Sequence, residues 1–213
     1  MFVQWSSKNA EKLFAQFHRL DEEVEETDDE DPADDADGEC VQLSSNGLAA
    51  LFDACGVDAD TDEITLVFAQ QCGAKTLGCI SKAEFLVGLR ALNADSVDQL
   101  KLALASLRRK LDASGPDRDL VSFVFDMARE SDEVKTIDPQ LASGLAALLL
   151  HKTALGARLA AFLAEQTVYR GINADQWIGI WEFSRSVGAD FSGYQEDGAW
   201  PIIIDEFVEW AKK

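Results

Sequence analysis

The sequence predicts an all-α protein. Almost every ordered segment places apolar residues three or four positions apart, which is the spacing of one helix face. Several of these segments begin at a serine, aspartate or asparagine that suits a helix N-cap. The 213 residues contain no strand-hairpin signature and no long alternation of polar and apolar residues. Because this length supplies one sizeable core, we expect about nine or ten helices in one compact domain.

Five helices are predicted in the first half of the chain. Their ranges are 6–20, 44–57, 62–73, 81–93 and 95–111. The fourth begins with a capping box, in which Ser81 is the N-cap and Glu84 the third helical residue. The fifth carries the clearest helical face, formed by Val97, Leu100, Leu104, Leu107 and Leu111. In residues 62–73 the apolar side chains are bunched and several are β-branched, so the helical pattern is weakest there.

Five more helices are predicted after a break near Gly115, which is a candidate boundary between two sub-bundles. Their ranges are 114–130, 141–152, 155–166, 173–187 and 201–213. Pro116 and Pro201 suit first helical turns, which tolerate proline. His151 lies at the end of an apolar helix, where a cation interacts favourably with the helix dipole. We expect this capping role for His151 rather than general-base catalysis.

One segment carries most of the net charge of −20. Thirteen of the 39 acidic residues and none of the 19 basic ones lie between Asp21 and Glu39, so the rest of the chain has a net charge of only −7. This segment has little to bury, and we expect a mobile acidic loop. The predicted organisation is therefore an N-terminal helix in residues 1–20, the acidic loop 21–39 and a main body in residues 40–213.

The charge and hydropathy of the chain restrict its partners and its location. An acidic protein repels phosphate backbones, which excludes direct nucleic-acid binding and favours a basic protein partner. The sequence has no run of about 18 apolar residues and no N-terminal signal-peptide pattern. We therefore expect a monomer in the cytoplasm or nucleus, with no membrane contact and with its four cysteines as reduced thiols.

Residue types that carry catalysis or bind metals are sparse. A zinc site needs cysteine and histidine ligands at short paired spacings. Here Cys72 and Cys79 are seven residues apart, while His18 and His151 lie far from both. No local motif pairs a cysteine with a general base. We expect no cofactor, no metal and no catalytic residue, and a protein that works by binding.

The acidic loop offers one alternative, a calcium site. An EF-hand loop needs oxygen ligands at positions 1, 3, 5 and 12 and a glycine at position 6. With Gly38 at position 6, Asp35 and Asp37 fall at positions 3 and 5, but Ala33 falls at position 1 and Ser44 at position 12. The bidentate glutamate is missing, so the sequence favours a solvated run of charge over a specific calcium site.

The C-terminal stretch YQEDGAWPIIIDEFVEW, residues 194–210, points to a family. Its string D-G-A-W-P-x-x-x-D-E-F-V-E resembles the end of the potentiating-neddylation domain of the defective-in-cullin-neddylation (Dcn-like) family. The segments SKAEFLVGLRALNA, DSVDQLK, FVFDMARE and NADQW…WEF fall in the family's order and spacing. The resemblance runs from about residue 10 to residue 210, and it is weakest in the Ala/Leu-rich part, residues 141–164.

The resemblance implies an all-helical domain built around EF-hand-like helix pairs that need not bind calcium. It implies a scaffold-type ligase for attaching a ubiquitin-like modifier to cullins, with no catalytic nucleophile of its own. Such a scaffold holds the cullin and the charged conjugating enzyme together, so that transfer becomes effectively intramolecular. This agrees with the sparse catalytic residues.

The family's cullin-binding residues are an Asp, an Ala and an Asp, which match Asp175, Ala199 and Asp205 here. We call these three the patch residues. The resemblance implies that they bind the winged-helix C-terminal domain of a cullin. Two carboxylates around a small apolar residue suit the charged heads and aliphatic stems of lysine or arginine.

The family's second site is a hydrophobic pocket for the acetylated N-terminal methionine of the conjugating enzyme. The positions that match it here are Leu48, Phe52, Leu66, Phe68, Leu77, Gly78, Ile80 and Met127. Core packing is an equal alternative for the apolar side chains among them. Gly78 replaces a cysteine and Met127 a phenylalanine that are usual in animal members. Gly144 and Ala147 stand at two further positions where an aromatic residue and a leucine are usual. These changes remove wall volume, so the alternatives are a wider pocket, a pocket reshaped for another N-terminus, or a lost pocket.

Three hypotheses from different classes follow. The first is the neddylation scaffold, which predicts dependence on Asp175 and Asp205. The second is an EF-hand-like calcium-responsive interaction module that uses Asp35 and Asp37. The third is a thiol enzyme that uses one of the four cysteines, which predicts a fast-reacting thiolate.

Overall fold

The computed structural model describes residues 5–25, 41–196 and 198–212, and the chain divides into two compact units, Met1–Ala113 and Ser114–Lys213. The division falls beside Gly115, where the sequence predicted a break. The described residues are mainly helical, which confirms the all-α prediction. Each unit has its own helices, its own short strand pair and its own core.

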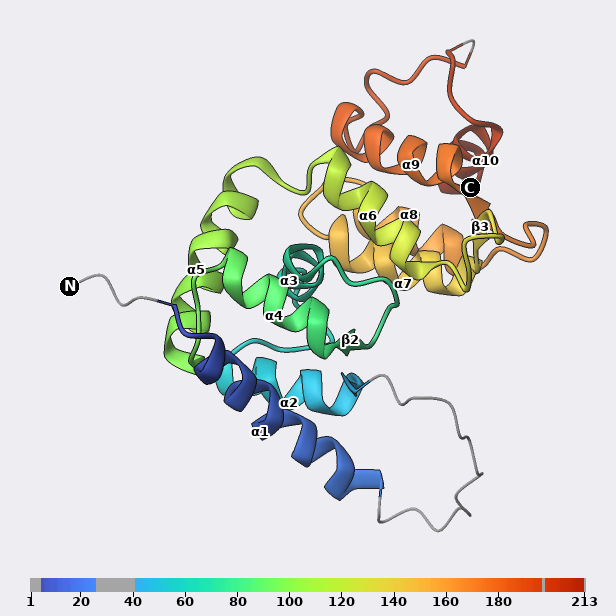
Figure 1. Ribbon diagram of the computed structural model, residues 1–213. Coiled ribbons are helices and arrows are strands. Elements are labelled where there is room, and N and C mark those ends of the chain that lie inside the picture. Colours follow the sequence, from blue (N-terminus) through green and yellow to red (C-terminus); the bar gives the residue numbers. More distant parts are fainter. Residues whose placement is uncertain (1–4, 26–40, 197, 213) are drawn as a thin grey trace. The chain divides into compact units, whose positions relative to one another are not determined.

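The first unit begins with a long helix and continues through three shorter ones to a second long helix (Figure 1). Its elements are α1 (Ser7–Glu25), β1 (Gln42–Leu43), α2 (Ser45–Cys55), α3 (Ile64–Cys72), β2 (Ile80–Ser81), α4 (Lys82–Ala91) and α5 (Val97–Ser114). Helix α1 packs against α2 and α4, and α3 packs against α4. Strands β1 and β2 pair antiparallel, with Gln42 opposite Ser81.

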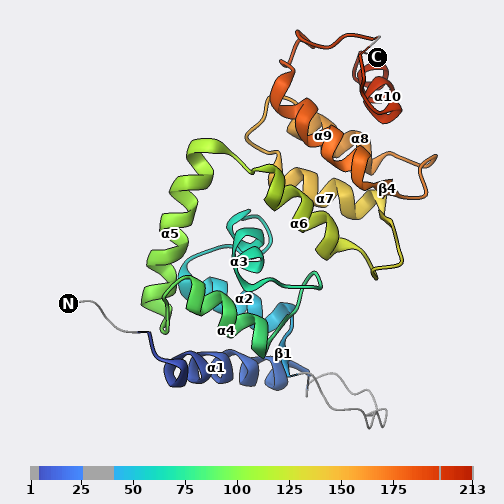
Figure 2. The ribbon, with the colours of Figure 1, turned by 45° about the horizontal axis from the view of Figure 1, so that its top comes forward.

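The second unit repeats the same local pattern. Its elements are α6 (Arg118–Ala128), β3 (Thr136–Ile137), α7 (Pro139–Leu149), α8 (Gly156–Ala164), β4 (Ile172–Asn173), α9 (Ala174–Ser186) and α10 (Ile202–Ala211). Helix α7 packs against α8, α9 packs against α6, and α10 packs against α8 and α9 (Figure 2). Strands β3 and β4 pair antiparallel, with Thr136 opposite Asn173. The EF-hand-like character of these helix pairs stays a prediction.

Capping side chains begin several helices where the sequence predicted them. The hydroxyl of Ser81 accepts from the Glu84 amide at 3.3 Å, and the Glu84 carboxylate accepts from the Ser81 amide at 2.8 Å, which confirms the capping box. Asn173 caps α9 in the same way with Gln176. Helix α2 ends at Cys55 and is capped by Gly56, whose φ of +73° is in the left-handed region that glycine adopts most easily.

Two features differ from the prediction. Helix α1 continues to Glu25, so the first five residues of the predicted loop 21–39 are helical, and residues 26–40 lie outside the described part. The two strand pairs were not predicted. Each strand has only two residues, which is too short to show the alternation of polar and apolar residues that predicts a strand.

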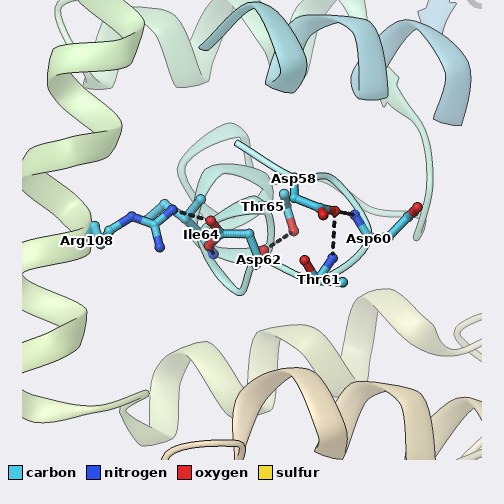
Figure 3. A network of polar contacts seen from close by, with 7 residues as sticks. All are labelled: Asp58, Asp60, Thr61, Asp62, Ile64, Thr65 and Arg108. Atoms are coloured by element: carbon cyan, nitrogen blue, oxygen red, sulfur yellow. Dashed lines mark hydrogen bonds and ion pairs between the residues drawn. The ribbon is translucent and has the colours of Figure 1, made fainter. Parts of the chain in front are cut away.

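The segment 62–73, where the helical pattern was weakest, does form a helix, and a polar network holds its start (Figure 3). Asp62 accepts from the Ile64 amide at 3.0 Å and forms an ion pair with Arg108 of α5. Asp58 accepts from the amides of Asp60 and Thr61, and these hydrogen bonds lower the pKa of its carboxyl. A side chain from α5 thus fixes the loop that begins α3.

Aromatic side chains fill the core of each unit. In the first unit Phe68 meets Phe52 and Phe85 edge to face, with ring centroids 5.5 and 6.2 Å apart. In the second unit Phe207 of α10 meets Phe183 of α9 at 5.9 Å. Buried aromatic side chains contribute strongly to folding because each removes a large apolar area from water. In the described residues no helix is both long enough and apolar enough to cross a membrane.

Candidate functional site

Asp175 lies exposed in the first turn of α9, where the structure fixes the backbone tightly. Asn173 and Gln176 exchange hydrogen bonds of 2.9 Å on either side of it. Trp177, which is buried, donates from Nε1 to the Val121 carbonyl of α6 at 3.0 Å. The carboxylate of Asp175 therefore sits on a rigid helix end whose dipole favours an anion.

Asp175 and Ala199 line the same groove, which we call the α9 groove. It has a volume of about 510 Å³ and is lined by Arg118, Asp175, Ile178, Gly179, Glu182, Ala199, Trp200 and Pro201. The four α9 residues follow one helix face. A Cβ at Gly179 would lie 2.8 Å from Cγ of Pro201, so this glycine lets the segment before α10 approach α9 closely. The structure thus brings together two of the three patch residues.

Asp205, the third patch residue, lies in the first turn of α10, outside the lining of the groove. It is half-buried, and its Oδ1 accepts a hydrogen bond of 2.7 Å from the hydroxyl of Tyr194. Burial, and then this bond to a carboxylate, raise the pKa of Tyr194 to about 12. At neutral pH the hydroxyl is protonated, as in any tyrosine, and its hydrogen bond restrains the position of the Asp205 carboxylate.

Sequence reasoning missed three residues of this region. Arg118 and Glu182 form an ion pair of 2.6 Å within the α9 groove, and Tyr194 positions Asp205. Glu182 could have been found from the sequence, because helical periodicity places it two turns after Asp175 on the same face of the helix. Arg118 and Tyr194 had none, because their contacts depend on how separate segments pack.

A second hollow, of about 450 Å³, also has Asp175 in its lining. It is lined by Phe125, Asp126, Arg129, Lys135, Asn173, Ala174 and Asp175. Arg129 donates to the carbonyls of the turn after α6, including Val134 at 3.0 Å, and pairs with Asp126 at 3.2 Å. Its charge is thus engaged in holding this turn, while Asp175 is exposed and lines both hollows.

The predicted conjugating-enzyme residues are mostly core residues of their units. In the first unit Leu48, Phe52, Leu66, Phe68 and Ile80 are buried, Leu77 is half-buried and Gly78 is exposed. Met127 is buried in the second unit. Gly78 has a φ of +83°, a conformation that a side chain would strain. The burial of six of these side chains agrees with core packing and does not exclude pocket lining, so the pocket stays a prediction.

Two buried thiols and His151 are placed where a structural role explains them better than a catalytic one. Burial raises the pKa of Cys55 to about 11 and raises that of Cys72 further, which disfavours the reactive thiolate. Nδ1 of His151 lies 2.8 Å from the Leu148 carbonyl at the end of α7, in keeping with the predicted capping role. Within the described residues no three His, Cys, Asp or Glu side chains are placed to hold a metal ion; Asp35, Asp37 and Cys40 lie outside that part.

Comparison with known proteins identifies the class of the chain. Residues 99–210 match a family model described as cullin binding. DCN1-like protein 5 of Homo sapiens is 37% identical over 170 residues, which cover 80% of this chain and 71% of the relative. DCN1-like protein 4 of Danio rerio is 38% identical over 171 residues, 80% of this chain and 60% of the relative. The protein of the same name from Drosophila melanogaster is 37% identical over 171 residues, 80% of this chain and 68% of the relative. The chain belongs to the DCN1-like family and carries its cullin-binding domain.

Proposed function

We propose that this protein promotes cullin neddylation as a non-catalytic scaffold, binding a cullin winged-helix domain through Asp175, Ala199 and Asp205. Its place in the DCN1-like family supports a role in cullin neddylation, and its cullin-binding domain supports a cullin as partner. The observation that carries the residue-level proposal is the α9 groove, which Asp175 and Ala199 both line.

The chemistry of the groove suits a basic side chain. Asp175 supplies an exposed carboxylate, while Ile178, Ala199 and Pro201 supply an apolar surface beside it. A lysine or arginine stem gains apolar contact there while its charged head reaches the carboxylate. The hydrogen bond from Tyr194 restrains the Asp205 side chain before binding, so less conformational entropy is lost when a partner binds.

The second half of the proposal is that the chain also holds the conjugating enzyme that carries the modifier. Holding both proteins on one scaffold raises their effective concentration, which accelerates transfer without a catalytic group on the scaffold. Burial raises the pKa of the Cys55 and Cys72 thiols, so these two are poorly suited to form a thioester themselves.

The test is the rate of modifier transfer from the charged conjugating enzyme to a cullin, with and without this protein. We expect the unaltered chain to accelerate transfer. Asp175→Asn should need about tenfold more protein for the same rate, which corresponds to about 1.4 kcal/mol of binding. Glu133→Gln removes the same charge at an exposed site outside both hollows and should leave the rate unchanged. No acceleration by the unaltered chain would contradict the proposal.

The conjugating-enzyme contact needs its own test, because the pocket residues are diverged. We propose titrating a fluorescent peptide that begins with acetylated methionine, beside the same peptide without the acetyl group. Binding of the acetylated form alone supports the pocket. Equal or absent binding of the two peptides would mean that Leu48, Phe52 and their neighbours serve the core.

A further inference from the structure

We infer that Glu182 is a second acceptor for a basic side chain of the cullin domain, and that Arg118 competes with that side chain for it. The inference rests on the proposed function and deepens it, because it concerns the same groove. It assigns a role to the two charged residues of the α9 groove that the family resemblance does not include.

The groove places a carboxylate at each end of one helix face. Asp175 and Glu182 are two turns apart on α9, a separation of about 10.5 Å along the helix axis. Ile178 and Gly179 lie between them and line the groove with them. A partner surface with two basic side chains at that separation would meet a carboxylate at both ends and an apolar surface between them.

Glu182 is already paired, but weakly. Arg118 Nη1 lies 2.6 Å from Glu182 Oε1, and the two side chains are 62% and 45% exposed. Exposed ion pairs contribute little to stability because water solvates both charges well. A guanidinium or ammonium group from a partner can therefore replace Arg118 at Glu182 without disturbing the fold.

The position of Arg118 indicates that its charge does not stabilise helix α6, to which it belongs. It is the first residue of α6, directly after the cap Asp117. A cation is unfavourable there, because the N-terminal end of the helix dipole is positive. Arg118 instead projects its charge into the α9 groove, where it partly neutralises the acidic surface. Its presence should weaken binding of a partner that is basic all along the groove.

The experiment is a calorimetric titration of the full chain with a purified cullin winged-helix domain at low and moderate salt. Arg118→Gln frees Glu182 and removes a charge that repels the partner, so we expect a dissociation constant about two- to fivefold lower. Glu182→Gln should raise it by a similar factor. Both effects should shrink as salt is added, because salt screens exposed charges.

Two control variants distinguish a specific effect of Arg118 from the effect of changing the net charge of the protein. Arg109→Gln removes the same charge from an exposed residue of α5 that lines neither hollow, and should leave affinity unchanged. Arg118→Lys keeps the charge but loses the guanidinium geometry, so its dissociation constant should lie between those of the unaltered chain and of Arg118→Gln. Thermal unfolding of each variant checks that the fold is intact.

The outcomes are distinct. Tighter binding by Arg118→Gln and weaker binding by Glu182→Gln support the inference. If the unaltered chain binds but neither variant differs from it, or if Arg118→Gln weakens binding, the inference is wrong while the proposed function stands. If the unaltered chain does not bind the cullin domain, the proposed function is wrong and this inference falls with it.

Discussion

The hydroxyl of Tyr194 donates to Oδ1 of Asp205 across 2.7 Å and so ties the loop before α10 to the first turn of that helix. Tyr194→Phe removes this bond but keeps the ring that packs edge to face on Phe183 at 6.0 Å. We expect the cullin domain to bind about two- to tenfold more weakly, because Asp205 must then be ordered during binding. Calorimetric titration measures the change.

Tyr169 supplies the matched control for that prediction. Its hydroxyl donates to Glu206 at 2.6 Å, so α10 has a second carboxylate bound by a tyrosine, one residue beyond Asp205. We expect Tyr169→Phe and Tyr194→Phe each to reduce the free energy of unfolding by about 1 kcal/mol, but Tyr169→Phe to leave cullin affinity unchanged. Equal losses of affinity in the two variants would contradict a specific positioning role for Tyr194.

The same hydrogen bond predicts a pH dependence of stability. The pKa of Tyr194 is raised to about 12 in the folded protein, above its usual value of about 10. Folding therefore favours the protonated hydroxyl, and this contribution is fully present below pH 10 and is lost as pH rises toward 12. We expect chemical denaturation between these two pH values to show a smaller loss of stability in Tyr194→Phe than in the unaltered chain.

Two helical glycines should respond to alanine with opposite signs. A Cβ at Gly88 of α4 would overlap Sγ of Cys72 and lie 3.1 Å from its Cα, so Gly88→Ala should cost about 1–3 kcal/mol. A Cβ at Gly144 of α7 would meet nothing within 4 Å, so Gly144→Ala should stabilise by about 0.5–1 kcal/mol. Denaturant unfolding measures both; stabilisation by Gly88→Ala would contradict the close packing of α3 and α4.

The buried thiols should react slowly with alkylating agents. Since burial raises the pKa of Cys55 to about 11 from 9.0, its thiolate fraction at neutral pH falls about a hundredfold. In a variant with Cys40→Ser and Cys79→Ser, we expect both remaining thiols to react far more slowly in the native chain than in denaturant. A native thiol that reacts faster than the unfolded one would support the thiol-enzyme hypothesis instead.

Most of the helices were predictable because their signals are local. The capping box of Ser81 and the cap at Asn173 depend on residues three positions apart, and the first forms as predicted. The weak pattern at 62–73 still forms a helix: Asp62, which precedes it, accepts from the Ile64 amide at its start, and Arg108, 46 residues away, holds Asp62 in place. No local pattern contains that second contact.

The site was predictable only in part, for the same reason. The resemblance pointed to Asp175 and Ala199, and the structure places both in one groove. The ion pair between Arg118 and Glu182 joins residues 64 positions apart, so it depends on how α6 packs against α9. The contact of Tyr194 with Asp205 depends on the path of the loop before α10, which no periodic pattern encodes.

The most direct test of the central claim is a calorimetric titration of the full chain with a cullin winged-helix domain, beside the variant Asp175→Ala, Ala199→Arg, Asp205→Ala. We predict that the unaltered chain binds and that the variant does not, while both unfold at similar temperatures. Binding of the variant with unchanged affinity would show that the patch residues are not the contact. Absence of binding by the unaltered chain would contradict the claim that this protein recognises that cullin domain.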